Sequence, residues 1–596
     1  MTEINTGAHP NSPAQRPKVL LDRRLTRWLI PMLRHGRSRF KVIQLAPLLA
    51  VLALTCWAFA SPVGSSPDDN FHLASIWCAG GNTANECRTL PDESRRAIPE
   101  ALVKSDCFAF KPNQSAACQG TIFDGTQNRM VSTATGNFAG TYPRLYYRTM
   151  NLFVSSNIEL SVLLMRIANI LLFVGLSTVL YRLLPARRRP PLVWGLAASI
   201  VPLGLFLLAS DNPSSWAIIS AGTLWISLVG YFECSGVRKV GLGVVAALST
   251  IVGAGARADS AIYAVVAIGA VVILSARLNR RWIVSALLPL ALAVTAAAFF
   301  FSTQQSLVAV SGLPGYGDSG PVHSGQELFF KNFLSVPSLW TGVFGHTGLG
   351  WMDTQLPALV WVGGFGCCVA LAFSGLVSQS ARKLLAVLMV LSALLLFPTY
   401  VAMRTGNVSG MGVQPRYILP LIILLIGVLL LEVGRARLRL STAQVVALVS
   451  TLSVANAIAL QFNIRRYITG ADVVSWNLNA AVEWWWSIGV SPMTVWALGS
   501  LSFAGLLVIL ARATTLTRFT DVPQGAPELQ DKPASFDGST DQGGNAPVLA
   551  IGAGSILEDR PAYRRVTTDD NHEGGLIGGQ QHSETRVHHG DHWTGR

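Results

Sequence analysis

Long apolar runs constrain this chain more than any other feature of its sequence. A helix needs about 20 apolar residues to cross roughly 30 Å of hydrocarbon, and about twelve such runs can be marked. They lie near residues 42–60, 158–181, 191–209, 214–232, 240–256, 259–275, 283–301, 356–378, 384–402, 417–433, 442–462 and 492–511. Only 13% of the residues are charged, whereas soluble proteins carry roughly 25%. The sequence therefore predicts an all-α integral membrane protein, a bundle of about 12 transmembrane helices.

Basic residues predict the orientation of this bundle. The net charge is +14, from 46 basic and 32 acidic residues, and the basic clusters lie beside the apolar runs. With about twelve spans, these clusters all fall on one side, which the positive-inside rule assigns to the cytoplasm. We therefore expect a multi-pass plasma membrane protein with both termini in the cytoplasm. The positive charge reports topology, so we expect no nucleic-acid partner.

The spans divide the chain into inside, membrane and outside segments. The long loops lie on the extracytoplasmic side, so we expect the functional site on that side. The predicted divisions are a cytoplasmic basic segment 1–41, a first transmembrane helix 42–60, an extracytoplasmic loop 61–157, transmembrane helices 2–7 in 158–302, a second large extracytoplasmic loop 303–355, transmembrane helices 8–12 in 356–511, and a disordered cytoplasmic tail 512–596. The tail is rich in Gly, Asp, Gln and Ser and has no apolar periodicity, which is typical of disorder.

Four of the eight cysteines fall in the first outer loop: Cys78, Cys87, Cys107 and Cys118. An oxidising compartment on that side would allow them to form disulfides. Four cysteines permit three pairings, and spacing alone does not choose among them. Our working prediction pairs Cys78 with Cys87 and Cys107 with Cys118.

Two adjacent carboxylates stand just beyond the first apolar run, in "SPDDNFH" at 66–72. Pro67 suits the start of a helix near Asp68, which would put His72 on the same face as Asp68 and Asp69. A carboxylate at a helix N-terminus stays ionised, as a general base must. The alternative is simple helix capping by aspartate, and these residues alone leave the two interpretations equal.

Three arginines could bind an anionic group despite the expected topology. Arg416, in "QPRYILP", lies at the outer start of a span, where its guanidinium could bind a phosphate; an interfacial arginine is the alternative. Arg257 in "GARADSA" could contact a donor or form a tight-loop ion pair with Asp259. Arg166 lies inside an apolar run, so its charge should be paired or face a polar cavity. It could bind the anionic group, and an interhelical salt bridge is an equal alternative.

The motif "GWMDT" brings an aromatic ring and a carboxylate together near the start of a span. Trp351 and Asp353 could bind a sugar acceptor through ring stacking and hydrogen bonds, and we add Tyr417 to this substrate-binding set. The alternative is that Asp353 caps the helix that follows. Further upstream, 325–345 interleaves aromatic and aliphatic residues, as a helix lying in the membrane interface would, although a packed loop fits equally.

Several motifs, in order along 61–420, carry a resemblance to known proteins: "SPDDNFH", "MRIANILL", "DNPSSWAI", "LGWMDTQLP" and "QPRYILP". With the long loop after the first span, they resemble the GT-C superfamily of membrane glycosyltransferases. More closely, the chain is similar to the actinobacterial branch of a widespread family of polytopic proteins. That family often has Glu where this chain has Asp69.

The resemblance implies a GT-C-like bundle that transfers a sugar from a polyprenyl-phosphate donor to an envelope glycan or lipid acceptor. It implies Asp68 as the catalytic base, and Asp69 and His72 as groups that orient it, bind the sugar, or hold a divalent cation such as Mg or Mn. It also implies an active site on the extracytoplasmic side. Two other functions remain open: a transporter or flippase of lipid-linked glycans, and a non-catalytic assembly factor.

Overall fold

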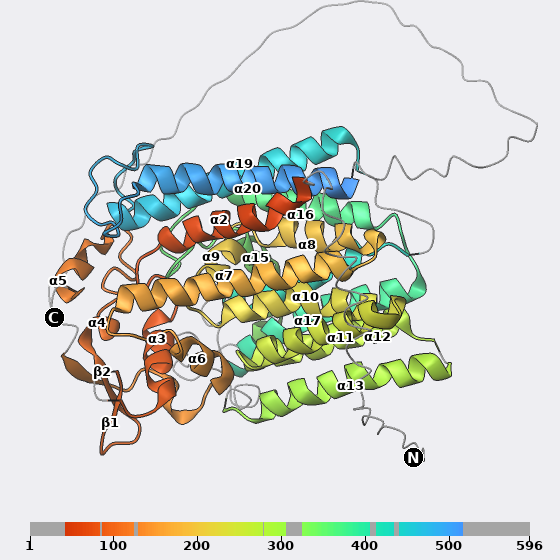
Figure 1. Ribbon diagram of the computed structural model, residues 1–596, viewed down its shortest axis with the longest axis horizontal. Coiled ribbons are helices and arrows are strands. Elements are labelled where there is room, and N and C mark those ends of the chain that lie inside the picture. Colours follow the sequence, from red (N-terminus) through yellow and green to blue (C-terminus); the bar gives the residue numbers. More distant parts are fainter. Residues whose placement is uncertain are drawn as a thin grey trace, which may run out of the picture. The chain divides into compact units, whose positions relative to one another are not determined.

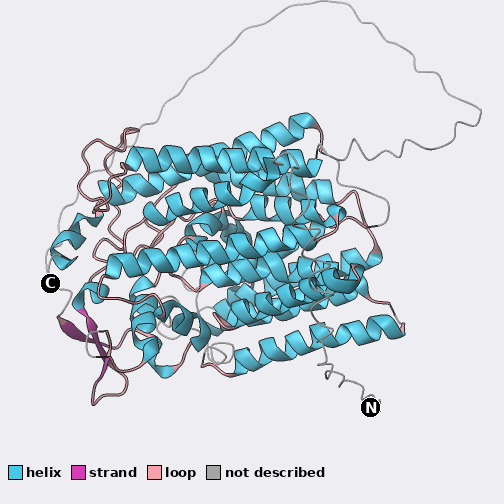
Figure 2. Cartoon of the chain, viewed as in Figure 1, coloured by secondary structure: helices cyan, strands magenta, loops and turns pink. Residues whose placement is uncertain are grey.

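The computed structural model describes residues 42–83, 86–123, 129–277, 279–304, 325–405, 413–433 and 440–515. Contacts divide the chain into two compact units, Met1–Val522 and Pro523–Arg596, and all described residues belong to the first. The predicted cytoplasmic segment 1–41 and nearly all of the predicted tail 512–596 lie outside the described residues. Within the first unit, helices dominate and strands are few (Figure 2).

Ten helices in the described part of the chain are long and apolar enough to cross a membrane, which confirms the predicted fold class. They are α2 (Ala46–Phe59, preceded by the short helix η1, Val42–Leu45), α7 (Ile158–Leu183), α10 (Ser214–Glu233), α11 (Gly236–Ala254), α12 (Ala258–Ser275), α13 (Arg280–Phe301), α16 (Ala358–Gly375), α17 (Ala381–Thr405), α19 (Thr442–Ile468) and α20 (Pro492–Thr515). Figure 1 shows them running roughly side by side; α2, for example, packs against α20, although the two lie at opposite ends of the described chain.

Two predicted spans differ from the structure, so the count of twelve is not confirmed. The run 191–209 is broken into α8 (Arg189–Ser199) and α9 (Leu203–Leu208), because Pro202 has no N–H to continue the helix. The run 417–433 forms the 15-residue α18 (Pro415–Leu429). All residues of α8 and α18 except Arg189 and Tyr417 are buried, so protein surrounds both helices and they need not match the thickness of a bilayer.

Glycines bring α8 and α18 into close contact. A Cβ built on Gly195 of α8 would lie 3.4 Å from the Cα of Gly427 on α18. Small residues allow helix backbones to approach in this way, and packing then replaces the hydrophobic effect as the source of association within a membrane. On its other side, Gly427 faces the indole ring of Trp225 on α10.

The predicted outer loop folds into short elements around α3 (Asp69–Trp77). They are η2 (Cys78–Gly80), β1 (Arg88–Thr89), β2 (Arg96–Pro99), α4 (Glu100–Val103), η3 (Ala116–Gln119), α5 (Gly120–Phe123), β3 (Met130–Thr133), η4 (Asn137–Ala139) and α6 (Arg144–Asn151). The strands form an antiparallel sheet in the order β1-β2-β3, with Arg96 opposite Thr133. These elements gather at one end of the helices, at the left of Figure 1, which we call the α3 end.

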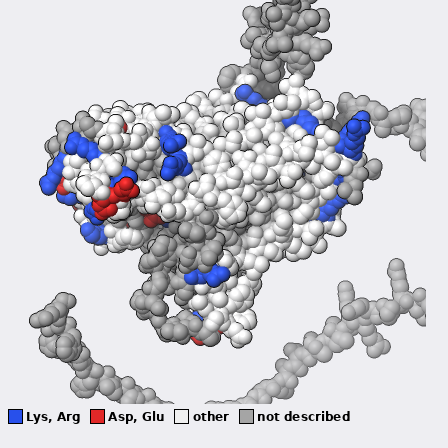
Figure 3. Space-filling model, turned by 90° about the horizontal axis from the view of Figure 1, so that it is seen from below, with Lys and Arg blue, Asp and Glu red and all other residues white. Residues whose placement is uncertain are grey.

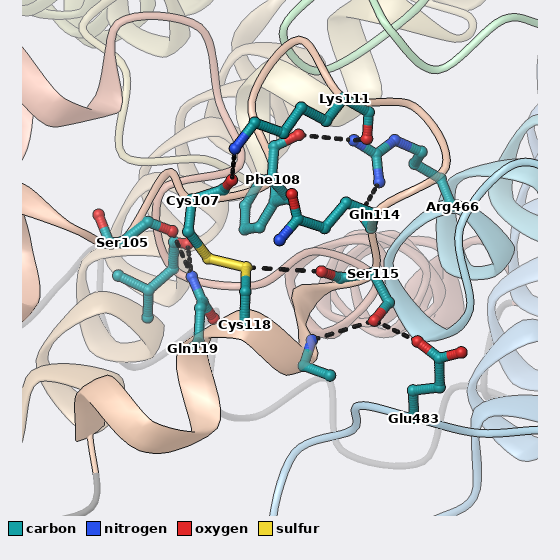
Figure 4. Close-up of a disulfide and its surroundings, with 12 residues drawn as sticks. Ser105, Cys107, Phe108, Lys111, Gln114, Ser115, Cys118, Gln119, Arg466 and Glu483 are labelled. Carbon is teal, nitrogen blue, oxygen red and sulfur yellow. Dashed lines mark hydrogen bonds between the residues drawn. A yellow bond between two sulfur atoms is a disulfide. The ribbon is translucent and has the colours of Figure 1, made fainter.

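Two disulfides fasten this segment, and both pairings agree with our prediction. Cys78 bonds Cys87, and Cys107 bonds Cys118. Figure 4 shows the second disulfide beside the side chain of Gln119, which donates to the main-chain oxygen of Ser105 at 2.5 Å. The disulfide thus closes a small loop whose backbone is also held by side-chain hydrogen bonds.

The predicted interface segment near 325–345 is indeed helical, as α15 (Gly325–Val343). Phe330 and Leu334 on this helix are 61% and 72% exposed, while Leu328, Val336 and Leu339 on the other face are buried. An apolar face open to the surroundings suits a helix that lies against lipid. The remaining short element is η5 (Ala186–Arg188), at the end opposite α3.

Charged side chains are distributed over the surface as expected for a membrane protein. In the view of Figure 3, lysines and arginines gather towards both ends of the described surface, the main group of acidic residues lies at the end that carries the sheet, and the middle is largely uncharged. Such a surface matches a hydrocarbon layer between two polar regions.

The close approach of α8 and α18 predicts that Gly427→Ala destabilises the bundle. The added methyl group would overlap the ring of Trp225, and overpacking typically costs about 1–3 kcal/mol. Gly175→Ala on α7 is the matched control, because nothing lies within 4 Å of its Cβ position. Thermal unfolding of both variants in detergent should show a lower midpoint for Gly427→Ala alone, and equal midpoints would contradict this packing.

Candidate functional site

The first acidic pair stands where the sequence predicted a helix start. Helix α3 begins at Asp69, and Asp68 is its N-cap residue. The main-chain oxygen of Asp68 accepts hydrogen bonds from the N–H groups of Phe71 (3.0 Å) and His72 (2.9 Å), but its carboxylate makes no capping bond. Side-chain capping, the alternative considered for Asp68, is therefore wrong.

The backbone of Asp68 adopts a left-handed conformation with φ of 63°. Residues with side chains rarely occupy this region, and such conformations cost of order 1–3 kcal/mol unless the surroundings impose them. The conformation turns the Asp68 carboxylate towards Arg416, which lies 348 positions later in the chain.

Asp68 and Arg416 form an ion pair in which only the aspartate is accessible to solvent. The side chain of Asp68 is 43% exposed, whereas that of Arg416 is 3% exposed. The same Nη2 of Arg416 donates to the hydroxyl of Tyr417 at 3.0 Å. Burial raises the pKa of Asp68, but the positive charges of Arg416 and Arg257 and the hydrogen bond from Arg416 outweigh it, so the pKa lies below its ordinary value and the carboxylate is ionised.

Arg416 retains donors that are not satisfied by the described residues. Its Nε and Nη1 are buried and have no hydrogen-bond partner there. A buried N–H group without a partner costs free energy, which an anionic ligand would recover. Arg416 also lies in the first turn of α18, where the helix dipole favours negative charge, and Gln414 provides no side-chain cap. This arrangement could hold a phosphate.

Arg257 lines the same site with its charge already paired. Its Nε and Nη2 donate to both carboxylate oxygens of Asp259 at 2.9 and 2.7 Å, so the predicted tight-loop ion pair is present. The guanidinium lies over the rings of Tyr417, at 4.8 Å, and Tyr142, at 5.7 Å. Arg257 and Arg416, predicted to bind the donor, therefore lie together with Tyr417, which was predicted to bind the substrate.

His72 is a buried neighbour of the pair and is only 1% exposed. Its Nδ1 lies 3.0 Å from the hydroxyl of Tyr147, and its ring meets the rings of Phe71 and Tyr142 edge-on. Burial lowers the pKa of His72 to about 3, more than the nearby Asp68 charge raises it. The imidazole is therefore neutral at neutral pH, and it suits a positioning role better than proton donation.

Asp69 points into the protein, away from Asp68. It is 0% exposed, and its Oδ2 accepts from the main-chain N–H of Ser66 at 2.9 Å. Burial, followed by the charge of Asp211, raises the pKa of Asp69 well above its ordinary value. Burial also raises the pKa of Asp211, to about 6, against the opposing effect of Arg166. These two buried carboxyl groups therefore do not both ionise easily.

Arg166 forms a buried salt bridge, the alternative to phosphate binding that the sequence offered, although its partner Asp211 lies in the turn before α10 and not on a second helix. Its Nε donates to Asp211 at 2.9 Å, and both side chains are 0% exposed. Its Nη atoms donate to the main-chain oxygens of Ala58, Ser61 and Pro62 at 2.6 to 2.9 Å. This guanidinium is fully engaged with the protein, so we assign it a structural role.

Trp351 supports the loop before Asp68, whereas Asp353 is held by Arg466. The Trp351 Nε1 donates to the main-chain oxygen of Gly64 at 2.9 Å, and the Asp353 carboxylate accepts from Arg466 at 2.8 Å. The proposed helix cap at Asp353 is wrong, because α16 begins at Ala358 with Pro357 as its N-cap. Both side chains are buried, at 7% and 8% exposure, and Asp353 is already ion-paired.

Arg466 is a central residue that the sequence analysis missed. Besides Asp353, its guanidinium binds the main-chain oxygens of Phe108, Lys111 and Gln114, as Figure 4 shows for the disulfide loop. The one available signal was an arginine pair, Arg465 and Arg466, just after the apolar run 442–462. Its partner lies 113 residues away, so no local pattern could identify it.

The expected metal ligands do not converge. Among the residues that the structure describes, no group of three His, Cys, Asp or Glu side chains could hold a metal ion. Asp68 turns towards Arg416, Asp69 turns inward to Ser66, and His72 bonds Tyr147. Asp68, Asp69 and His72 therefore do not fit a shared divalent cation, and we derive no chemistry from one.

The fold and this site define a polytopic helical membrane protein with a polar cluster at one end of its helices. The model of the family described as "Predicted membrane protein (DUF2142)" matches residues 51–425, more than half of the 596-residue chain, so the chain belongs to that family. A search of curated proteins found no match. The matched range contains Asp68, Arg257 and Arg416, but it ends before Arg466.

The environment of Asp69 predicts an unusual dependence of stability on pH. The folded state holds this proton to a higher pH than the unfolded state, so the stabilisation is complete below the ordinary pKa of 3.8 and is lost as pH rises through the folded pKa. The slope reaches up to about 1.4 kcal/mol per pH unit for one proton. Asp69→Asn, which keeps the shape without an ionisable group, should flatten this dependence.

Unfolding midpoints measured in detergent between about pH 4 and 8 test this expectation. The matched control is Asp92→Asn, which removes an exposed carboxylate of the same segment between α2 and α7 and should leave the decline with pH intact. Parallel curves for the wild-type protein and Asp69→Asn would show that Asp69 is ionised in the folded state.

Proposed function

We propose that the chain is a GT-C-type glycosyltransferase, which moves a sugar from a polyprenyl-phosphate donor to a cell-envelope glycan or lipid acceptor. In this proposal the α3 end faces the outside of the plasma membrane, where such donors present their sugar. Asp68 is the base and Arg416 binds the donor phosphate. The family resemblance suggested this assignment, and the geometry around Asp68 supports it.

One observation carries the proposal: a half-exposed, ionised carboxylate lies beside a buried guanidinium with two unpartnered donor atoms. Asp68 is accessible to an acceptor hydroxyl, and its lowered pKa keeps it in the basic form at neutral pH. The Nε and Nη1 atoms of Arg416 have no hydrogen-bond partner among the described residues, so both could donate to an oxyanion of the substrate. A purely structural ion pair would be expected to satisfy both partners.

The reaction balances with these groups alone. The acceptor oxygen attacks the anomeric carbon and forms the new glycosidic bond, while Asp68 takes the hydroxyl proton. The bond between the anomeric carbon and the phosphate oxygen breaks, and its electron pair leaves with the polyprenyl phosphate. Arg416 stabilises that charge, and the dipole of α18 adds to the effect.

Neighbouring residues have supporting parts in this scheme. Arg257 is neutralised by Asp259, so it adds little net charge but holds the ring of Tyr417 through a cation–π contact. Tyr417 in turn accepts from Arg416 and limits the orientations of its guanidinium. His72, neutral and bonded to Tyr147, packs behind Asp68 and keeps water from that side.

Asp68→Asn should abolish transfer of a labelled sugar from polyprenyl phosphate, by about 10²–10⁴-fold for loss of a general base. The assay uses full-length protein in proteoliposomes with a panel of polyprenyl-phosphate sugars, because the site does not identify the sugar. Asp92→Asn is the control for a lost outer carboxylate. Unimpaired transfer by a folded Asp68→Asn protein would remove Asp68 from the mechanism, and movement of intact donor across the vesicle without transfer would favour a flippase.

Arg416→Gln should weaken donor binding more than acceptor binding, because it removes the charge opposite the phosphate. In competition with free polyprenyl phosphate, we expect a large loss of inhibition, with the inhibition constant rising at least about tenfold. Arg257→Gln is the matched variant: its charge is already paired with Asp259, so its effect should be smaller. An equal effect of both substitutions would count against a phosphate bound by Arg416.

A further inference from the structure

An apolar groove lies at the end of the helices opposite α3, between α2, α7, α8 and α20. Its volume is about 520 Å³, within the range of roughly 300 to 1,000 Å³ that small-molecule sites occupy. Phe173, Leu192, Leu196, Phe503 and Leu507 supply much of its wall. Figure 1 shows α2, α7, α8 and α20 as neighbours in the upper half of the bundle.

The break between α8 and α9 explains why the groove exists. The short helix α9 packs against α2 and α7, whereas α8 packs against α18, α16 and α20. The chain changes direction at Ile200–Pro202, so α8 leaves the surface formed by α2 and α7. The groove is the space between α8 and the pair α2 and α7. Side chains from all three helices line it, and it continues to the end of α7.

Two arginines border this groove where α7 ends and α8 begins. Arg182 lies in the last turn of α7, and Arg189 is the first residue of α8. Neither forms an ion pair with a carboxylate in the described ranges, in contrast to the neighbouring Arg187 and Arg188, which both bind Glu233. Arg189 instead lies 4.9 Å from the ring of Tyr181.

Buried polar atoms in the same groove also lack partners among the described residues. They are the Nε of Arg189 and the Oγ of Ser177, which lies just over one helical turn before Arg182. An unpartnered buried donor is costly, so a ligand with acceptor oxygens at this depth would be favoured. Towards the end of α7, the groove presents first its apolar wall, then the hydroxyl of Ser177, and then the guanidinium groups of Arg182 and Arg189. A phospholipid has its acyl chain, glycerol ester and phosphate in the same order.

We propose that this groove binds one anionic phospholipid, with an acyl chain against the apolar wall and its phosphate between Arg182 and Arg189. The opposite charges of arginine and phosphate select the headgroup, and burial of the acyl chain supplies affinity. The site is separate from the proposed donor site. Arg182 lies 16 residues beyond Arg166 in α7, about 24 Å further along the helix axis.

The proposal is tested on the full chain, purified in detergent and exchanged into mixtures of phosphatidylglycerol and phosphatidylcholine. Native mass spectrometry then measures which lipid remains bound. The wild-type protein should retain one phosphatidylglycerol in preference to phosphatidylcholine. Arg182→Ala with Arg189→Ala should weaken this retention about tenfold or more, because each arginine near a membrane surface contributes to binding of anionic lipid.

Two further variants separate a specific site from general attraction. Arg238→Ala removes another exposed arginine, in the first turn of α11 and outside the groove, and should retain the lipid as the wild-type protein does. Ala197→Trp fills the groove without a change of charge and should lose the lipid. Unfolding midpoints in detergent identify any variant that has simply lost its fold, and only folded variants are compared.

The outcomes that overturn the proposal are distinct. Equal retention of phosphatidylglycerol and phosphatidylcholine would show an unselective lipid shell, and unchanged retention in the double arginine variant would place the lipid elsewhere. A wild-type protein that retains no lipid would show that the groove is filled in another way. None of these results depends on the glycosyltransferase proposal, because the assay measures lipid binding alone.

Discussion

The buried guanidinium of Arg166 holds the structure around the candidate site together. It is fully buried and binds three main-chain oxygens, that of Ala58 in the last turn of α2 and those of Ser61 and Pro62 just beyond it, while its Nε pairs with Asp211. An isolated charge in this position would be prohibitive, and a buried pair contributes little net stability of its own. Its effect is specificity: the partners of its three nitrogens come from α2 and the residues after it and from the turn before α10, so these segments must keep their positions relative to α7.

That position fixes the loop that leads to Asp68. Three side chains from distant segments bind its main-chain oxygens: Trp351 at Gly64, Tyr467 at Ser65 and Asn212 at Pro67. A loop held at three of the four residues before Asp68 cannot relax easily, which accounts for the left-handed backbone of Asp68. The cost of that conformation is met by contacts elsewhere, and the carboxylate is held beside Arg416 before any ligand arrives.

The sequence predicted those features that depend on residues close together in the chain. Apolar runs predicted the spanning helices because hydrocarbon demands continuous apolar length, and Pro67 located the start of α3. The interruption of 191–209 was missed because a proline within an apolar run leaves the hydropathy unchanged. The roles of Asp353 and Arg166 depended on partners far away in the chain, so the sequence could only offer alternatives. Arg416 was found through its motif, but its unpartnered donors are visible only in three dimensions.

The adjacent acids Asp68 and Asp69 show how one sequence pair can serve two purposes. The helix start sends successive side chains in different directions: the half-exposed Asp68 towards the buried guanidinium of Arg416, and Asp69 towards the interior beside Asp211. The first carboxylate is therefore ionised, and burial favours the neutral form of the second. A single acid could not combine both states at one pH. The pair thus places a charged group at the surface of the site, while a buried neighbour whose neutral form is favoured anchors the helix beneath it; the proposed role of Asp68 as a base would use this division.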